Sequence, residues 1–236
     1  MKLVLTNDDG IDEPGMGVLE TLCRAHGEVV VVAPSGPRSA ISHTVTERGE
    51  IRVDARGPGR FAVDGTPADC ARLALRELAP DADWLISGIN AGANLGADVY
   101  VSGTVAAARE AALHGRPALA ISQYIRRFQS LDWRASAGRA ERVLAHVLER
   151  ECEAGAFWSA NLPHPADESR ECAIVECPLD PSPAGIGYAR SPAGFTWDGD
   201  YHGRPRRPGH DVAVCFGGRT ALTFLHVAHA AAAAPR

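Results

Sequence analysis

The feature that most constrains the fold lies at the start of the chain, where a short apolar run ends in two adjacent carboxylates. Leu3-Val4-Leu5 is followed by Thr6-Asn7-Asp8-Asp9-Gly10. A run of this length that stops at Asn, Asp and Gly is typical of a buried strand that enters a loop. We therefore expect Asp8 and Asp9 just beyond the carboxyl end of the strand, where open α/β sheets bind their ligands.

The adjacent carboxylates of Asp8 and Asp9 repel each other unless a cation or a shared proton lies between them. A hard divalent cation is the simplest resolution. The alternative is a polar loop in which one of the two aspartates caps the next helix. The segment by itself leaves both interpretations open.

The next segments complete a βαβ unit. Residues 14–25 carry apolar residues at helical spacing, and residues 28–33 form a β-branched run that ends at Pro34. The loop that follows should face the same sheet edge as the first loop. It offers the Ser39 hydroxyl and the Arg38 charge, although a solvated turn rich in Gly, Pro and Ser is the alternative.

Residues 43–70 predict short strands followed by a helix. The strands are expected at 44–46, 51–53 and 61–63. Thr66 suits the N-cap of the helix, and Asp69 stands where the acid of a capping box would lie.

A second polar loop follows the predicted buried strand 83–88. It carries Asn90 and Asn94 among three glycines and leads into Ser102-Gly103-Thr104, which begins a helix that runs to about residue 114. Free N–H groups and hydroxyls at a helix start make an anion site. The alternative is a glycine loop with an ordinary N-cap.

The rest of the chain divides by composition. A strand at 117–122, a helix at 135–150 and a strand at 157–162 complete the predicted α/β core, whereas residues 163–211 are dense in Pro, Gly, Arg and Asp and indicate short strands with a hairpin arm. Strands are expected at 211–215 and 220–225, and a short helix or frayed end at 230–236. We therefore expect an α/β core over 1–162, and an extension over 163–236 that returns to the core and is not an independent domain.

Composition excludes several classes of protein. The formal charge of −5 argues against a stable nucleic-acid partner, and Lys2 is the one lysine, so a P-loop lysine is absent. Six cysteines without a Cys-x-x-Cys pair indicate reduced thiols in a cytoplasmic protein. The first strand follows Met1 almost at once, so no signal peptide is expected, and no apolar run is long enough to span a membrane.

All the candidate ligands in these loops are oxygens, because the histidines and cysteines are scattered. Oxygen ligation favours Mg²⁺, Mn²⁺ or Ca²⁺ over structural zinc. A hard cation beside an anion site of phosphate size indicates phosphoester hydrolysis.

At this point the sequence resembles the SurE family of metal-dependent nucleotidases. The motifs that carry the resemblance cover roughly residues 1–122 and are LTNDDG (5–10), RS (38–39), GTPADC (65–70), SGINAGANLG (87–96) and SGTVAAA (102–108). Ala93 departs from the usual proline, and residues 163–211 are shorter than in the family and match it poorly, although 211–213 and 220–222 resemble its closing strands.

The resemblance implies hydrolysis of nucleoside 5′- and 3′-monophosphates with one divalent cation per subunit, Mg²⁺ or Mn²⁺, or Ca²⁺ in a crystal. It implies a three-layer α/β sandwich with a mostly parallel, Rossmann-like sheet and a β-rich C-terminal extension exchanged between subunits of a homodimer, or in a dimer of dimers. The implied metal ligands are Asp8, Asp9, Ser39 and Asn90, and the implied phosphate contacts are Asn94, Ser102, Gly103 and Thr104.

In the mechanism expected from these residues, Asp8 or Asp9 accepts a proton from the attacking water. One rival is an aspartyl-phosphate phosphatase with Asp8 as nucleophile, but the second acid that this chemistry usually needs would fall at Gly10. The other rival is a nucleotide- or phosphate-binding module without turnover, which leaves the paired aspartates unexplained.

Overall fold

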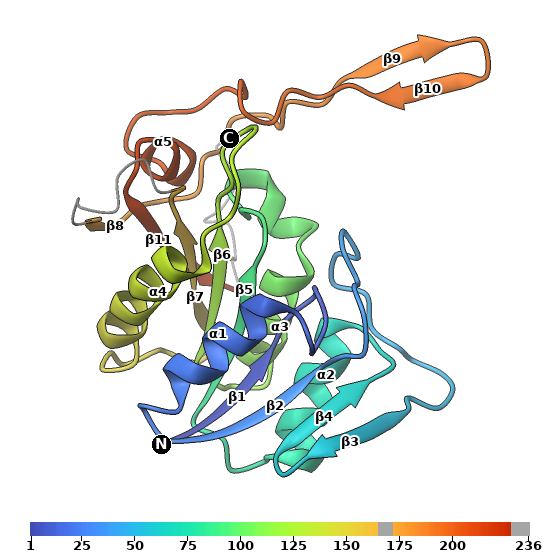
Figure 1. The fold of residues 1–236 in the computed structure, drawn as a ribbon, viewed down its shortest axis with the longest axis vertical. Helices are drawn as coiled ribbons and strands as arrows, with labels where there is room; N and C mark the ends of the chain where they lie inside the picture. Colours follow the sequence, from blue (N-terminus) through green and yellow to red (C-terminus); the bar gives the residue numbers. More distant parts are fainter. Residues whose placement is uncertain (165–171, 228–236) are drawn as a thin grey trace, which may run out of the picture.

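The computed structural model describes residues 1–164 and 172–227, and a nine-stranded sheet runs through them (Figure 1). The strand order is β3-β4-β2-β1-β5-β6-β7-β11-β8. The predicted tail at 230–236 lies outside the described residues. The strands of this sheet are β1 (Lys2–Thr6), β2 (Glu28–Pro34), β3 (Val53–Gly57), β4 (Arg60–Val63), β5 (Trp84–Asn90), β6 (Ala118–Gln123), β7 (Ala156–Leu162), β8 (Ile174–Glu176) and β11 (Thr220–His226).

The centre of the sheet is parallel. β4, β2, β1, β5, β6 and β7 run in one direction, whereas β3 is antiparallel to β4 and β11 is antiparallel to β7. Because β1 and β5 are buried along almost their whole length, they read as continuous apolar runs. The carboxyl ends of β1, β2, β5 and β6 therefore meet at one edge of the sheet.

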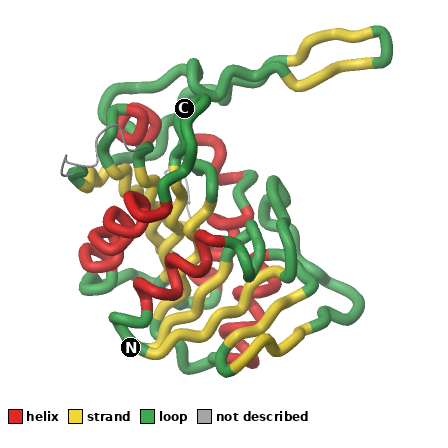
Figure 2. The backbone as a smooth tube through the Cα atoms, in the orientation of Figure 1, coloured by secondary structure: helices red, strands yellow, loops and turns green. Residues whose placement is uncertain are grey.

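Helices cover both faces of the sheet, as Figure 2 shows in red against the yellow strands. α1 (Pro14–Cys23) and α4 (Trp133–Val147) pack on one face, over a core that includes Met16, Leu19 and Leu144. The opposite face is covered by α2 (Pro67–Leu73), η1 (Ala74–Leu78) and α3 (Gly103–Leu113). The structure confirms the predicted three-layer α/β sandwich with a mostly parallel sheet.

Two predicted helix starts have the expected local chemistry. The Thr66 hydroxyl accepts a hydrogen bond from the Asp69 N–H, and the Asp69 carboxylate accepts one from the Thr66 N–H, which makes a capping box at α2. The Ser102 hydroxyl accepts from the Val105 N–H and caps α3.

Three of the strand predictions were wrong in whole or in part. Residues 44–46 form no strand, and of 51–53 only Val53 belongs to β3. Residues 211–215 form α5 (Asp211–Phe216) rather than a strand. The run was too short for its period to decide, and Val212, Cys215 and Phe216 stand at helical spacing over a small third core.

The part of the chain after β7 contributes to the main sheet and also leaves it. β8 and β11 extend the sheet. η2 (Gly96–Tyr100), which follows β5, contacts α5 through a hydrogen bond from the Gly96 N–H to the Asp211 carboxylate. β9 (Tyr188–Ser191) and β10 (Gly194–Trp197) pair as an antiparallel hairpin that projects away from the rest of the molecule (Figure 1). Among the described residues, no helix is long and apolar enough to cross a membrane.

Candidate active site

Asp8 is held between three segments at the carboxyl edge of the sheet. Its side-chain Oδ1 accepts a hydrogen bond of 2.5 Å from the Thr104 hydroxyl at the start of α3. Its backbone carbonyl accepts one of 2.7 Å from the Arg38 N–H in the loop after β2. Asn7 closes the turn itself by hydrogen bonds to the backbone of Gly10. The loops after β1 and β2 and the start of α3 thus meet at Asp8.

The Asp8 carboxylate is buried, with 6% of the residue exposed. Burial raises its pKa to about 6, the Thr104 hydrogen bond opposes that rise, and the charge of Asp9 adds to it. Gly103 leaves room for the carboxylate, because a Cβ at this position would lie 2.9 Å from the Asp8 Cβ. The start of α3 therefore faces Asp8 directly, and its helix dipole favours a negative charge there.

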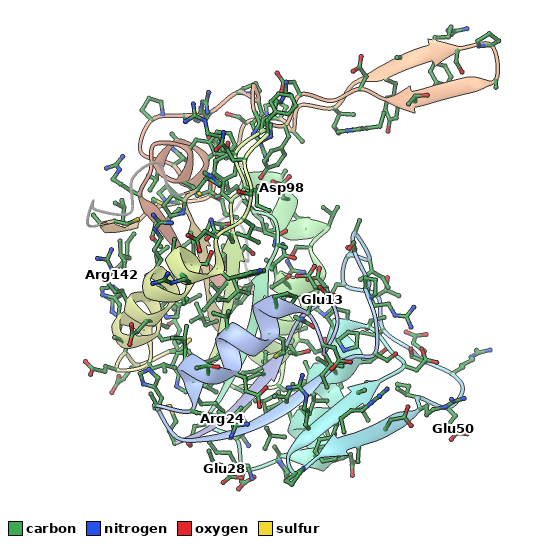
Figure 3. All side chains as sticks on the ribbon, viewed as in Figure 1. Glu13, Arg24, Glu28, Glu50, Asp98 and Arg142 are labelled. Atoms are coloured by element: carbon green, nitrogen blue, oxygen red, sulfur yellow. The ribbon has the colours of Figure 1, made fainter. Side chains whose placement is uncertain are left out.

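Asp9 faces the neighbouring loop after β5. Its Oδ2 accepts a hydrogen bond of 3.2 Å from the Ala91 N–H, which places the carboxylate beside Asn90. Burial raises the pKa of Asp9, and the charge of Glu13 adds to the rise. Figure 3 shows Glu13 at the beginning of α1.

The two carboxylates have no cationic partner within residues 1–164 and 172–227. No salt bridge to Asp8 or Asp9 occurs there, and the described part of the chain has no group of three His, Cys, Asp or Glu side chains that suits a metal. Paired carboxylates with raised pKa values, surrounded by hydroxyl and amide oxygens, are a donor set for a hard cation. The residues present therefore fit Mg²⁺ or Mn²⁺.

Asn90 and Ser39 lie on either side of this pair. The Asn90 side-chain nitrogen donates a hydrogen bond of 2.7 Å to the Gly92 carbonyl, so the bond uses the amide nitrogen and not its oxygen. Ser39 is exposed and follows Arg38, the residue whose N–H reaches Asp8. The structure thus brings the loops that carry all four predicted metal ligands to one edge.

The predicted phosphate contacts are all buried, and the side chains of Asn94, Ser102 and Thr104 make internal hydrogen bonds. The side-chain nitrogen of Asn94 donates to the Ser122 hydroxyl at 2.7 Å, and its backbone N–H donates to the Asn161 side chain at 2.8 Å. The Ser102 hydroxyl caps α3, and the Thr104 hydroxyl donates to Asp8. The start of α3 is therefore occupied by the Asp8 carboxylate, an arrangement that the sequence did not indicate.

Sequence reasoning missed the residues that support the site. Ser122 and Asn161 lie one position before the ends of β6 and β7 and hold the loop of Asn94. Buried polar residues at the ends of apolar strands were the available signal.

Glu110 was also missed. It lies in the second half of α3, is 2% exposed, and hydrogen-bonds His43 at 2.7 Å, Arg72 at 2.6 Å and His114 at 3.0 Å. The bond to His43 ties the segment after Ser39 to α3. Burial raises the Glu110 pKa, but the hydrogen bonds from His43 and Arg72 together outweigh it and lower the pKa to about 2.

Comparison with known proteins identifies the family of the chain. The family model described as survival protein SurE matches residues 3–178. A putative 5′-nucleotidase of Synechocystis is 42% identical over 228 residues, which cover 96% of this chain and 100% of that protein. A protein named 5′-nucleotidase SurE from Rhizorhabdus wittichii is 36% identical over 252 residues, covering 99% and 98% of the two chains.

A crystal structure of the SurE protein from Aquifex aeolicus superposes with a TM-score of 0.84 at 27% identity, over 97% of this chain and 94% of that one. On the family match, the relatives and the shared fold, the chain belongs to the SurE family.

Proposed function

We propose that this protein is a phosphomonoesterase that hydrolyses nucleoside 5′- and 3′-monophosphates to nucleoside and phosphate. The observation that carries the proposal is the adjacent pair of the buried Asp8 and the half-buried Asp9 at the carboxyl edge of a parallel sheet, with no cationic partner among the described residues. The relatives named 5′-nucleotidase SurE support the substrate class.

The proposed metal ligands are Asp8, Asp9, Ser39 and Asn90. A divalent cation, Mg²⁺ or Mn²⁺, supplies charge neutralisation at the phosphoryl group and makes a water molecule more acidic. The chain contributes two carboxylate charges, one serine hydroxyl and one amide oxygen, which suit an ion of this hardness. Burial disfavours the ionised forms of both aspartates, and a bound cation would offset that cost.

Side chains of the protein orient the aspartates, accept the proton and contact the phosphate. The Thr104 hydroxyl fixes the orientation of Asp8. Asp8 or Asp9 accepts the proton of the attacking water, as a general base within reach of the phosphate. Asn94, Ser102, Gly103 and Thr104 are the proposed phosphate contacts, and phosphate would replace one of the internal hydrogen bonds that these side chains make in the structure.

The proposal also covers the domain organisation, the oligomeric state and the cellular compartment of the protein. We treat residues 1–162 as the nucleotidase core and residues 163–236 as an extension of it, which the membership of β8 and β11 in the core sheet supports. A homodimer formed through the projecting hairpin is proposed, with a dimer of dimers as the larger assembly. Six free cysteines support a reducing, cytoplasmic compartment.

The test is phosphate release from a panel of nucleoside 5′- and 3′-monophosphates. We expect turnover with added Mg²⁺ or Mn²⁺ and background release in EDTA. Turnover that persists in EDTA would contradict the cation assignment. Binding of nucleotides without turnover of any phosphoester would replace the enzyme with a non-catalytic binding module.

A further inference from the structure

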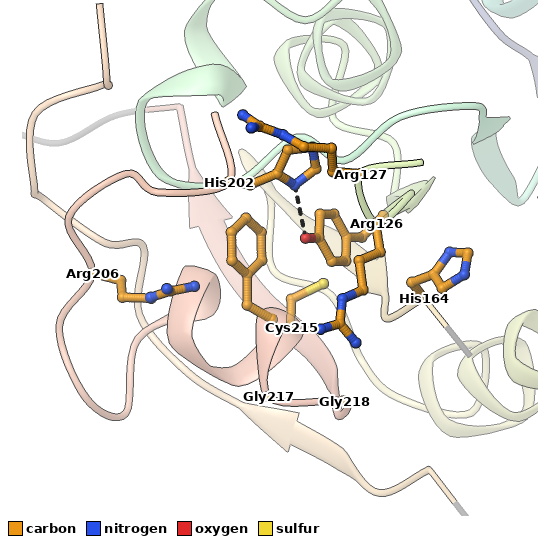
Figure 4. A pocket seen from close by; sticks show the side chains of 10 residues that line it. Arg126, Arg127, His164, His202, Arg206, Cys215, Gly217 and Gly218 are labelled. Carbon is orange, nitrogen blue, oxygen red and sulfur yellow. Dashed lines mark hydrogen bonds between the residues drawn. The ribbon is translucent and has the colours of Figure 1, made fainter. Parts of the chain in front are cut away.

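A second polar cavity, of about 490 Å³, lies on the same edge of the sheet as the aspartates. Tyr124 directly follows β6, His164 follows β7, and Phe216 ends α5; all three line it (Figure 4). β5 separates β6 from β1, so at the usual spacing of strands the cavity lies roughly 10 Å or more from Asp8. It is therefore a neighbour of the candidate active site and not a part of it.

The lining of this cavity is strongly basic. Arg126, Arg127 and Arg206 line it, and no Asp or Glu does. Arg127 pairs with Asp200 at 2.6 Å. Among the described residues, neither Arg126 nor Arg206 makes a salt bridge. Two guanidinium groups thus have no carboxylate partner among residues 1–164 and 172–227 of a chain whose formal charge is −5.

The Arg206 side chain is preorganised. Its guanidinium lies over the ring of Phe216 at 5.1 Å, and that ring stacks on Tyr124 with centroids 4.3 Å apart. The Tyr124 hydroxyl hydrogen-bonds the Nδ1 of His202 at 3.0 Å, which fixes the opposite wall (Figure 4). A guanidinium held flat by an aromatic ring loses less freedom when it binds an anion.

The charges of the arginines reach both histidines of the cavity. Burial is the largest cause of the lowered pKa of His164, and the charges of Arg139 and Arg126 lower it further. Burial also lowers the pKa of His202, the charge of Arg127 acts in the same direction, and the charge of Asp200 opposes it. Both histidines are therefore disfavoured as cations beside these arginines.

We propose that this cavity binds a phosphate group, delivered by inorganic phosphate or by a nucleotide, at a site that performs no hydrolysis. Two guanidinium groups without a carboxylate partner among the described residues match the charge and the fork geometry of a phosphate dianion. The cavity lacks the carboxylates that the candidate active site uses, so binding there does not depend on the proposed reaction.

The experiment is calorimetric titration of the full chain with inorganic phosphate in EDTA. Without a cation, the charges of Asp8 and Asp9 repel phosphate from the candidate active site, so the signal reports the second cavity. The variant is the double substitution Arg126→Gln and Arg206→Gln. The matched control is Arg207→Gln, an exposed neighbour that does not line the cavity.

We expect the wild type to bind phosphate, the double variant to bind it about tenfold more weakly or worse, and the control to match the wild type. A parallel titration with adenosine 5′-monophosphate identifies the ligand. If the nucleotide binds more tightly than inorganic phosphate, the ligand is a nucleotide. If the two bind equally, the ligand is free phosphate. The double variant should keep its turnover with Mg²⁺. The turnover assay therefore tests the proposed enzyme function independently of phosphate binding in the second cavity. Equal phosphate affinity in the double variant and the wild type, or no binding by the wild type, would overturn the proposal.

Discussion

At the scale of single residues, Asp9 tests the metal assignment. We predict that Asp9→Asn lowers turnover at limiting metal about 100-fold, a loss typical of removing one group that stabilises charge in a transition state. Without metal, the variant should unfold at the same temperature as the wild type or higher, because burial raises the Asp9 pKa and the ionised form therefore costs stability. The measurements are phosphate release and thermal unfolding in EDTA.

Asp12→Asn is the control for this substitution, since the Asp12 side chain is 76% exposed and stands in the same loop. It should behave as the wild type in both assays. Near-normal turnover of Asp9→Asn at limiting metal would end the assignment of Asp9 as a ligand.

Thr104 tests how Asp8 is positioned. We predict that Thr104→Val lowers turnover and destabilises the protein by about 1–3 kcal/mol, because the buried Asp8 carboxylate loses its 2.5 Å hydrogen bond. Thr104→Ser keeps the hydroxyl and should retain most of the turnover and most of the stability. The measurements are kcat and urea unfolding of the three proteins. A valine variant as active as the serine variant would show that the hydroxyl does not position Asp8.

The residues of the candidate site could be predicted from sequence more readily than their contacts. The end of an apolar run placed Asp8 and Asp9 at the edge of the sheet, because that rule depends only on neighbours in the chain. The bond from Thr104 to Asp8 joins residues 96 positions apart, and local pattern carries no information about it. The same holds for Asn161 and Asn94, which are 67 positions apart.

At the scale of elements, α3 is held by an ionic network whose stability should depend on pH. The Glu110 pKa falls from its ordinary 4.5 to about 2 in the folded protein. The network therefore contributes fully above pH 4.5, and its contribution is lost as the pH falls toward 2, because the unfolded chain takes up the proton first. We predict that Glu110→Gln loses less stability than the wild type over this interval.

At neutral pH the same variant should be less stable than the wild type by about 3 kcal/mol, the usual effect of removing one partner from a buried ion pair. The measurement is urea unfolding at a series of pH values. Glu149→Gln, an exposed change on the surface, is the control. Parallel stability curves for Glu110→Gln and the wild type would contradict the role of Glu110.

Helix starts were predictable where side chains cap the backbone locally, as at Thr66 and Ser102. The helix α5 could not be predicted, because its five-residue apolar run at 212–216 fits the period of a helix and that of a strand. Its position depends on distant bonds: the Asp211 carboxylate accepts N–H groups from Gly96 and Asp180, each at 2.7 Å. Tertiary contacts of this kind decide between helix and strand when the segment is short.

At the scale of the whole molecule, changes in the hairpin formed by β9 and β10 test whether it forms the proposed dimer interface. Its apolar side chains are uncovered, with Tyr188 and Phe195 each 65% exposed and Trp197 57% exposed. Such a surface favours a second copy of the chain as its cover. We predict that replacing residues 188–197 with Asn-Gly converts a dimer into a monomer. The measurement is the mass by light scattering.

The deletion must stop short of residue 204. Arg204 is buried and donates to Asp98 at 2.6 Å, so its loss would damage the core rather than test the interface. Phe195→Asp is a milder variant that should weaken the dimer in the same direction. A deleted protein that remains a dimer would show that the subunits meet elsewhere.

The mostly parallel sheet of the α/β core could be predicted from alternating apolar runs and helices in the first 162 residues, but its strand order was not predicted. The path after Leu162 could not be predicted, because β8 and β11 join the sheet through pairings between distant segments and the hairpin has little core of its own.

The hairpin leaves the molecule through a narrow base, where the Asp198 N–H donates to the Gly187 carbonyl at 2.8 Å. The ten residues between these two positions form a loop whose ends already meet, and the family match stops at residue 178, before the loop begins. Insertions and deletions in this loop leave every strand of the sheet in register. The arm is thus a module that evolution, or an engineer, can lengthen, shorten or exchange without disturbing the nine-stranded sheet or the edge that carries Asp8 and Asp9.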